Sequence, residues 1–123
     1  MSGYISGQTA IVTGAARGIG LGIARRLAAD GCRVAVWDRD TTPLEDVSDF
    51  APDFVQQVDI TDLGAVERAF AAAVEALGEI QILVNNAGIN GPVVAHWEYP
   101  ADQWDRVLAV NLTGVFYCCR TVV

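Results

Sequence analysis

Apolar residues gather in short runs along the chain, and segments with helical spacing separate these runs. Runs rich in Val, Ile and Leu predict strands at residues 9–12, 33–38 and 80–84, with a weaker strand at 54–58. Runs that are apolar almost throughout, with few polar residues between, are typical of a parallel sheet covered on both faces.

The segments between the runs supply the covering helices. Apolar residues recur every four positions from Ile19 to Leu27, and Gly31 follows where a left-handed glycine ends a helix. A clearer second helix is predicted to begin at Thr61 as its N-cap and to end at Gly78. Strand and helix in alternation predict a doubly wound α/β sheet with right-handed crossovers. The apolar face of the second helix is predicted to carry Leu63, Val66, Phe70, Val74 and Leu77.

A third helical pattern runs from Pro100 to Val123 with no glycine, asparagine or proline stop signal of the usual kind. Because the sequence ends inside this pattern after only four strands, we expect residues 1–123 to be the front part of a longer polypeptide. The fourth strand would then be an unprotected edge, and one apolar face of the last helix would be partly bare.

The segment from Thr13 to Gly20 directly follows the first strand and opens the first helix, with the spacing G-x-x-x-G-x-G. Gly14 permits a tight turn, while Gly18 and Gly20 remove Cβ atoms where a pyrophosphate and the next strand approach. The helix N-terminus offers free N–H groups and a positive dipole end to phosphates. The turn predicts dinucleotide binding, although a glycine-rich turn alone can be only a tight connection.

Asp38, at the end of the second strand, lies about 20 positions after the turn, as dinucleotide-binding folds require. Its carboxylate can accept both ribose hydroxyls and would repel a 2′-phosphate, which favours NAD over NADP. Arg17 and Arg39 point the other way, because either side chain can pair with a 2′-phosphate.

Four ordered motifs resemble the short-chain dehydrogenase/reductase family. They are residues 13–20, the pair Asp59 and Ile60, residues 85–88 (Asn-Asn-Ala-Gly), and Asn111. The resemblance covers residues 8–123 and implies the N-terminal part of one Rossmann-type, NAD-binding domain with the strand order 3-2-1-4. It implies cofactor contacts at Thr13, Gly14, Arg17, Gly18, Ile19, Gly20, Asp38, Arg39, Asp59, Ile60, Asn86, Ala87 and Gly88.

Three of these motifs have an ordinary structural alternative. The resemblance places Asp59 against the adenine ring, but a carboxylate next to Thr61 can also serve the helix entry. Residues 85–88 would support the central sheet and leave Gly88 bare for the cofactor, or form a plain turn. Asn111, in the middle of an apolar stripe, is expected to be buried and hydrogen-bonded. In the family it is an active-site residue that holds a water; otherwise it bonds backbone within a kinked helix, helped by Gly114.

The chain has no lysine, since all eight of its basic residues are arginine. The family's chemistry rests on a serine and a Tyr-x-x-x-Lys pair, and that pair cannot form in these residues. His96, with Glu98 nearby, is expected to fill a surface or loop role more readily than to contact substrate. We therefore expect the longer parent to transfer hydride between NAD(H) and a secondary alcohol or ketone, with this piece alone inactive. The alternatives are a non-catalytic dinucleotide-binding module and a fragment that needs complementation.

Composition narrows the remaining classes. A net charge of −7 disfavours nucleic acid as a partner. The 52% content of hydrophobic residues excludes a disordered tail, and no apolar run approaches the length of a membrane span. Three cysteines, two of them adjacent, form no disulfide framework and no metal-binding spacing, which predicts a cytoplasmic protein without a metal site. The resemblance adds a small-molecule substrate and a homo-oligomer for the full-length protein.

Overall fold

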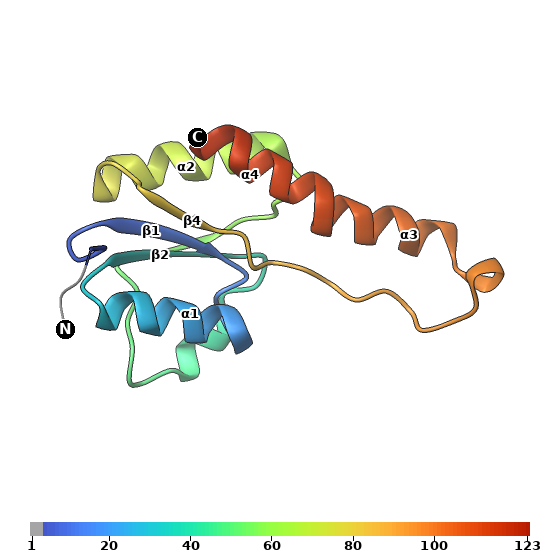
Figure 1. The fold of residues 1–123 in the computed structure, drawn as a ribbon, viewed down its shortest axis with the longest axis horizontal. Helices are drawn as coiled ribbons and strands as arrows, with labels where there is room; N and C mark the ends of the chain where they lie inside the picture. The colour runs from blue at the N-terminus through green and yellow to red at the C-terminus, as the bar shows by residue number, and fades with distance from the viewer. Residues whose placement is uncertain (1–3) are drawn as a thin grey trace.

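The predicted strands form one parallel sheet in the computed structural model, which describes residues 4–123 (Figure 1). The strands are β1 (Thr9–Thr13), β2 (Arg33–Asp38), β3 (Phe54–Gln57) and β4 (Ile82–Val84). Their order in the sheet is β3-β2-β1-β4, which confirms the predicted order. β1 extends one residue beyond its prediction, β3 ends one residue early, and β4 begins two residues late.

Helices cover both faces of this sheet, as the continuous apolar runs predicted (Figure 1). Helix α1 (Gly18–Ala29) lies on one face, and α2 (Leu63–Leu77) and α4 (Gly114–Val122) lie on the other. Because successive strand residues point to opposite faces, β2 feeds two separate cores. Val34 and Val36 pack with Ala24 of α1, whereas Ala35 and Trp37 pack with the residues of α2 and with Cys118 of α4.

The helix ends agree with the sequence at glycine and disagree at one cap. Gly31 and Gly78 follow α1 and α2 with φ values of 96° and 82°, which only glycine adopts freely. The N-cap predicted at Thr61 is wrong, because α2 begins one residue later and Asp62 caps it by accepting a hydrogen bond from the N–H of Ala65 at 3.1 Å. The hydroxyl of Thr61 is already donated to Asp59.

The buried face of α2 is narrower than predicted. Val66 and Leu77 are buried, but Val74 is 37% exposed, and Ala69 and Ala73 take the positions nearest the sheet and α4. Two alanines at this contact let the helix backbone approach its neighbours closely, and a valine at the edge of the face is left partly in solvent.

The C-terminal segment is one continuous helix with a π-helical turn in its middle. It comprises α3 (Ala101–Leu108), the turn η3 (Ala109–Thr113) and α4. Its outer side carries exposed apolar side chains, with Trp104 54%, Leu112 65% and Phe116 59% exposed. None of the helices in the described part of the chain is long and apolar enough to cross a membrane.

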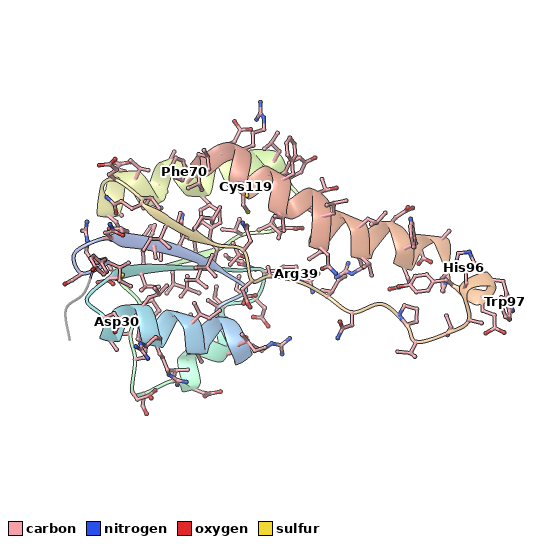
Figure 2. All side chains as sticks on the ribbon, viewed as in Figure 1. Asp30, Arg39, Phe70, His96, Trp97 and Cys119 are labelled. Carbon is pink, nitrogen blue, oxygen red and sulfur yellow. The ribbon has the colours of Figure 1, made fainter. Side chains whose placement is uncertain are left out.

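The connection from β4 to α3 extends away from the sheet and turns back through the short helix η2 (His96–Glu98) (Figure 1). Figure 2 shows His96 and Trp97 at the tip of this extension, far from Arg39 at the end of the sheet. Both tip residues are exposed, which agrees with the surface role expected for His96. A second short helix, η1 (Thr42–Asp46), connects β2 to β3.

Candidate functional site

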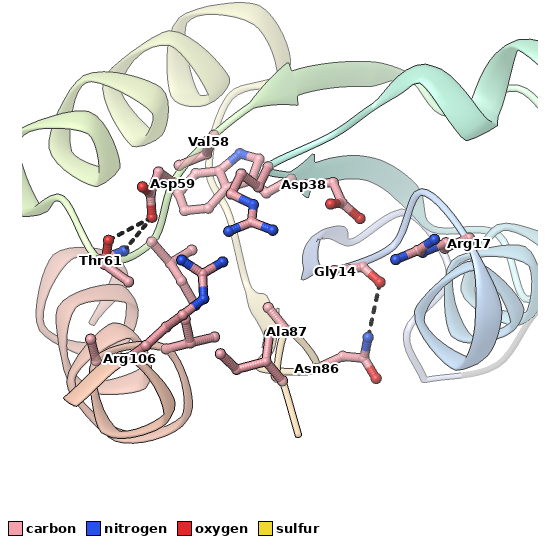
Figure 3. A pocket seen from close by; sticks show the side chains of 16 residues that line it. Gly14, Arg17, Asp38, Val58, Asp59, Thr61, Asn86, Ala87 and Arg106 are labelled. Atoms are coloured by element: carbon pink, nitrogen blue, oxygen red, sulfur yellow. Dashed lines mark hydrogen bonds between the residues drawn. The ribbon is translucent and has the colours of Figure 1, made fainter. Parts of the chain in front are cut away.

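A cavity of about 360 Å³ opens at the carboxyl ends of the strands (Figure 3). The turn after β1, the end of β2, the connection after β3, the segment after β4 and the helix α3–η3 all contribute to its wall. Its volume falls in the range of small-molecule sites, and its position is the ligand crevice of open α/β sheets. Of the predicted site residues, it is lined by Gly14, Arg17, Asp38, Arg39, Asp59, Ile60, Asn86, Ala87 and Gly88.

The first turn after β1 is shaped for a ligand approaching the N-terminus of α1. Gly14 and Gly18 have φ values of 65° and 61°, and no atom of the described chain lies within 4 Å of the place where a Cβ on Gly18 would stand. Arg17, the N-cap residue of α1, makes no side-chain capping hydrogen bond. The first N–H groups of this helix are therefore open to an anion.

Gly20 is required by the protein itself. A Cβ there would stand 2.2 Å from the carbonyl oxygen of Gly14 and 2.5 Å from Nδ2 of Asn86. Gly20 therefore leaves room for its own turn and for Asn86, in the segment after the neighbouring strand β4, while its role beside a pyrophosphate stays a prediction. Ile19 is 80% exposed and, like Gly18 and Gly20, lies outside the cavity lining.

Thr13 and Asn86 tie the end of β1 to the segment after β4. The buried hydroxyl of Thr13 accepts hydrogen bonds from the N–H groups of Asn86 at 3.1 Å and Ala87 at 3.0 Å, and donates to the carbonyl of Val84 at 3.4 Å. Nδ2 of Asn86 donates to the carbonyl of Gly14 at 3.0 Å (Figure 3). Thr13 thus supports the wall of the cavity without lining it. Residues 85–88 do not form a plain turn, because their hydrogen bonds tie them to the end of β1.

Asp38 holds its carboxylate at the rim with two backbone bonds. Oδ2 accepts from the N–H of Ala16 at 3.0 Å, and Oδ1 accepts from the N–H of Asp40 at 3.1 Å. The side chain is half-buried, whereas Arg17 and Arg39 on either side of the rim are exposed. Each carboxylate oxygen keeps a further lone pair, so Asp38 can accept additional bonds from a ligand.

Asp59 stands at the cavity and also supports the turn before α2, while its contact with an adenine ring stays a prediction. It lines the cavity, and its Oδ1 also accepts from the hydroxyl of Thr61 at 2.7 Å and from the N–H of Thr61 at 3.0 Å (Figure 3). These two bonds, the hydroxyl first, hold the pKa of Asp59 below its ordinary value, and the positive charges of Arg39 and Arg106 lower it further. Asp59 is therefore an anion at neutral pH.

Ile60 is buried and lies between the cavity and α4. A Cβ on Gly114 would stand 2.7 Å from Cδ1 of Ile60, so the first residue of α4 packs directly on this side chain. Gly114 therefore serves the packing of α4 on Ile60. It does not help Asn111 to bond the backbone of a kinked helix, which was the alternative prediction.

The expectation that Asn111 is buried is wrong. Asn111 is exposed, outside the cavity lining, and its amide pairs with the backbone of Ile89 instead of its own helix. Oδ1 accepts from the N–H of Ile89, and Nδ2 donates to its carbonyl, both at 2.8 Å. Asn111 stands in the π-helical turn η3, and a Cβ on Gly88 would lie 3.3 Å from its Oδ1. The amide holds the loop that leaves the cavity.

Sequence reasoning missed several lining residues, of which Arg106 and Trp37 matter most. Arg106 comes from the charged side of α3, where nothing in the sequence separates it from a solvated residue. Trp37 is fully buried, its Nε1 donates to Oε1 of Gln56 at 2.7 Å, and its edge still reaches the cavity. The sequence did offer one signal for Trp37, which is its position directly before Asp38 in the same strand.

Charge is distributed unevenly around the cavity. Three of the eight arginines line it, together with two aspartates, although the chain as a whole carries a charge of −7. Among residues 4–123, no group of three or more histidine, cysteine, aspartate or glutamate side chains is arranged to hold a metal ion. The wall therefore suits an anionic organic ligand.

Comparison with known proteins decides the family. The model of the short chain dehydrogenase family matches residues 8–123. The chain belongs to this family.

Named members of the short-chain dehydrogenase family align over almost all of these residues. The 2-dehydro-3-deoxy-L-rhamnonate dehydrogenase (NAD(+)) of Sphingomonas sp. strain SKA58 is 41% identical over 99% of the chain and 49% of its own length. The 2-(R)-hydroxypropyl-CoM dehydrogenase of Xanthobacter autotrophicus is 42% identical over 94% of the chain and 50% of its own length. The chain thus spans about half the length of these relatives.

Solved short-chain dehydrogenases share the fold of this chain. The 3-ketoacyl-(acyl-carrier-protein) reductase of Brucella melitensis complexed with NADH gives a TM-score of 0.90 at 34% identity, over 97% of this chain and 50% of that one. The NAD⁺-bound xylitol dehydrogenase gives a TM-score of 0.91 at 33% identity, over 98% of this chain and 48% of that one. The sheet is therefore Rossmann-type, as expected.

Replacing Gly20 by alanine tests the contact between α1 and the first turn. Because the carbonyl of Gly14 cannot move away cheaply, we expect Gly20→Ala to lower the free energy of unfolding by about 1–3 kcal/mol in urea denaturation. Gly22 lies in the same helix with nothing within 4 Å of its Cβ position, so Gly22→Ala should raise stability by about 0.5–1 kcal/mol. Equal effects of the two substitutions would contradict the proposed contact.

The hydrogen bond from Thr61 predicts a shift in the titration of Asp59. Thr61→Val removes the hydroxyl and keeps the N–H, so we expect the pKa of Asp59 to rise toward its ordinary value in an NMR titration. A carboxyl with a lowered folded pKa stabilises the protein above its unfolded pKa of about 3.9, and this contribution is lost as pH falls through the folded value. The stability difference between wild type and Thr61→Val should therefore be present at pH 7 and disappear in acid.

A matched control is built into the chain. Thr42 makes the same pair of bonds to Oδ1 of Asp40, at 3.0 Å from its N–H and 2.7 Å from its hydroxyl. Thr42→Val should leave the pKa of Asp59 unchanged. A shift of Asp59 in this control, or no shift in Thr61→Val, would contradict the assignment.

Proposed function

We propose that these residues form the cofactor-binding part of an oxidoreductase that transfers hydride between NAD(H) and a secondary alcohol or its ketone. The observation that carries the proposal is the carboxylate of Asp38 at the rim of a cavity that also receives the open N-terminus of α1. One end of this cavity accepts phosphate, and its rim accepts hydroxyl groups, which are the two features of an adenosine diphosphate moiety.

The residues present fit such a cofactor. Gly18 leaves free space above the turn, and the N–H groups of α1 face that space without a side-chain cap. Asp38 accepts hydrogen bonds from the ribose hydroxyls, and Asp59 accepts one from the exocyclic amine of adenine. Ala87 and Gly88 border the path toward the nicotinamide end of the cofactor. When bound, the cofactor supplies the hydride acceptor or donor. We propose no substrate class narrower than an alcohol or ketone, because the names of the relatives give chemically different substrates.

NAD is proposed over NADP because the negatively charged carboxylate of Asp38, a hydrogen-bond acceptor, is held in place. Its two backbone bonds fix the carboxylate where a 2′-phosphate would stand, and repulsion between the two anions opposes NADP. Arg17 and Arg39 could offset that repulsion only by turning toward the same point. The relative named for NAD(+) and the neighbours bound to NADH and NAD⁺ support this choice.

The complete protein, in this proposal, adds the serine, tyrosine and lysine that its relatives' family uses, beyond the segment described here. Asn111 is proposed as the active-site asparagine, with its side chain used for positioning. Its amide makes one hydrogen bond in each direction with Ile89, which leaves one N–H and one lone pair of the amide to hold a water.

The alternative function is a dinucleotide-binding module without catalysis, or a fragment completed by another chain. This alternative is supported by the absence of lysine from all 123 residues, because the catalytic Tyr-x-x-x-Lys pair needs a lysine. Calorimetry with NAD, together with an alcohol-oxidation screen on the complete protein, separates the two. Binding without turnover of any alcohol or ketone would favour the non-catalytic module.

For the complete protein we further propose a cytoplasmic homo-oligomer. Its cysteines are free in this structure, and the stripe formed by Trp104, Leu108, Leu112 and Phe116 is spaced every four residues along the C-terminal helix. Side chains at this spacing lie on one helix face, and an exposed apolar stripe of this kind is typical of a contact between helices.

The carboxylate of Asp38 predicts a change in cofactor preference. Asp38→Asn keeps an acceptor for the N–H of Ala16 but removes the charge, so the ratio of NAD to NADP affinity should fall by about tenfold, or about 1.4 kcal/mol. Titration calorimetry with each dinucleotide on the complete protein measures this ratio. Asp49→Asn makes the same charge change on the surface, where Asp49 pairs with Arg25, and should leave it unchanged. An unchanged ratio in Asp38→Asn would rule out the carboxylate assignment.

The exposed stripe predicts the effect of charge on assembly. A Leu112→Glu/Phe116→Glu double variant of the complete protein should elute as single chains by light scattering while its circular dichroism stays native. Val93, which is 101% exposed in the loop before α3, serves as the control through Val93→Glu. A double variant that still assembles, or one that unfolds because its own chain covers the stripe, would contradict the interface.

A further inference from the structure

Arg106 enters the cavity from α3, on the side away from the glycine turn (Figure 3). In the close-up it lies with Asp59 and Thr61 at one end, while Gly14 and Arg17 lie at the other. Ala109 and Val110 follow three and four positions later and line the same wall, because residues at this spacing share a helix face.

The end of the cavity near Arg106 has the chemistry of a purine site. Val58 and Ile60 flank Asp59 in the chain and, with Val110 on the helical wall, supply apolar side chains to the lining, and Asp59 supplies one anionic acceptor. The N–H groups suited to phosphate lie at the opposite end, at the start of α1. A ligand with a flat aromatic base at one end and phosphates at the other matches this division.

The guanidinium of Arg106 is not committed elsewhere in the protein. Within residues 4–123, no hydrogen bond or ion pair engages its side chain, whereas Arg25 and Arg26 are paired with Asp49 and Asp30. Its positive charge still acts on Asp59, whose pKa it helps to lower. A planar cation next to an apolar slot, left without a protein partner, is placed to meet a ligand.

Resting on the proposed binding of NAD, we propose that Arg106 is a specificity residue whose guanidinium stacks on the adenine ring beside Asp59. The flat guanidinium packs on aromatic faces more effectively than an ammonium group does, and it attracts the electron-rich face of the ring. Arg106 thereby encloses the ring from the α3 side, while Asp59 accepts from the exocyclic amine.

Two probes separate a base contact from a phosphate contact. ADP-ribose carries the base, ribose and the phosphates, whereas adenosine carries the base and its ribose without phosphate and has no net charge. We expect Arg106→Ala to weaken the binding of both by about tenfold, measured by calorimetry for ADP-ribose and by NMR titration for adenosine. Because Arg106 is exposed and unpaired, its removal should leave the melting temperature unchanged.

Substitutions at the same helix complete the test. Arg106→Lys keeps the charge and loses the plane, and should remain weaker than wild type by about threefold or more. Arg120→Ala removes an exposed arginine of α4 outside the cavity and should bind both probes as the wild type does.

Each failure has a distinct meaning. If the wild type binds neither probe, the proposed function itself fails. If the wild type binds both and Arg106→Ala binds them equally well, only the role of Arg106 is overturned. Loss of ADP-ribose binding with adenosine binding unchanged, or full recovery in Arg106→Lys, would replace the adenine contact by simple attraction of phosphate.

Discussion

The hydroxyl of Thr13 and the amide of Asn86 join the carboxyl ends of the neighbouring strands β1 and β4, and the cavity depends on this junction. The hydroxyl engages the carbonyl of Val84 at the end of β4 and the N–H groups of Asn86 and Ala87 after it, and the amide reaches back to Gly14. Gly14 and Gly20 are then glycines because their neighbours across this junction leave no room for a Cβ. Two of the glycines that read as phosphate-binding residues are thus required first by the packing of the protein, and the ligand uses the shape that results.

The same end of the sheet reverses the electrostatic character of the chain. An acidic protein repels anions over most of its surface, but the open N-terminus of α1 and the arginines around the cavity offer a local positive field. Asp38 and Asp59 stand inside this field, and the positive charges of Arg39 and Arg106 help to lower the pKa of Asp59. In the proposed function, attraction of a dinucleotide and selection among dinucleotides come from different residues: the N–H groups and arginines attract, and the two carboxylates discriminate.

Much of this arrangement follows from the sequence, since apolar runs and glycines report burial and turns directly. Predictions from the sequence fail where two neighbouring residues compete for one role, or where the partner of a side chain lies far away along the chain. Thr61 loses the N-cap position to Asp62 because its hydroxyl is used by Asp59. Asn111 is misplaced because a π-helical turn inserts an extra residue and shifts the helix face that spacing predicts. Arg106 is invisible in the sequence, because an arginine on a charged helix face has no local signature of a ligand site.

The cavity consequently has a firmly held half and a lightly held half. Strand ends, the glycine turn and Asn86 form the first, through buried hydrogen bonds and contacts that tolerate no added atom. The wall made by α3 and η3 is joined to the rest by the pairing of Asn111 with Ile89 and by Val110, which packs against the core on the α2 side of the sheet. In the proposed function, the phosphates of the dinucleotide meet the half that buried hydrogen bonds hold, and Arg106 meets the base from the helical wall without a protein partner to give up. The carboxylate of Asp38, by contrast, is fixed by two backbone bonds, so cofactor selection comes from a residue that cannot turn away.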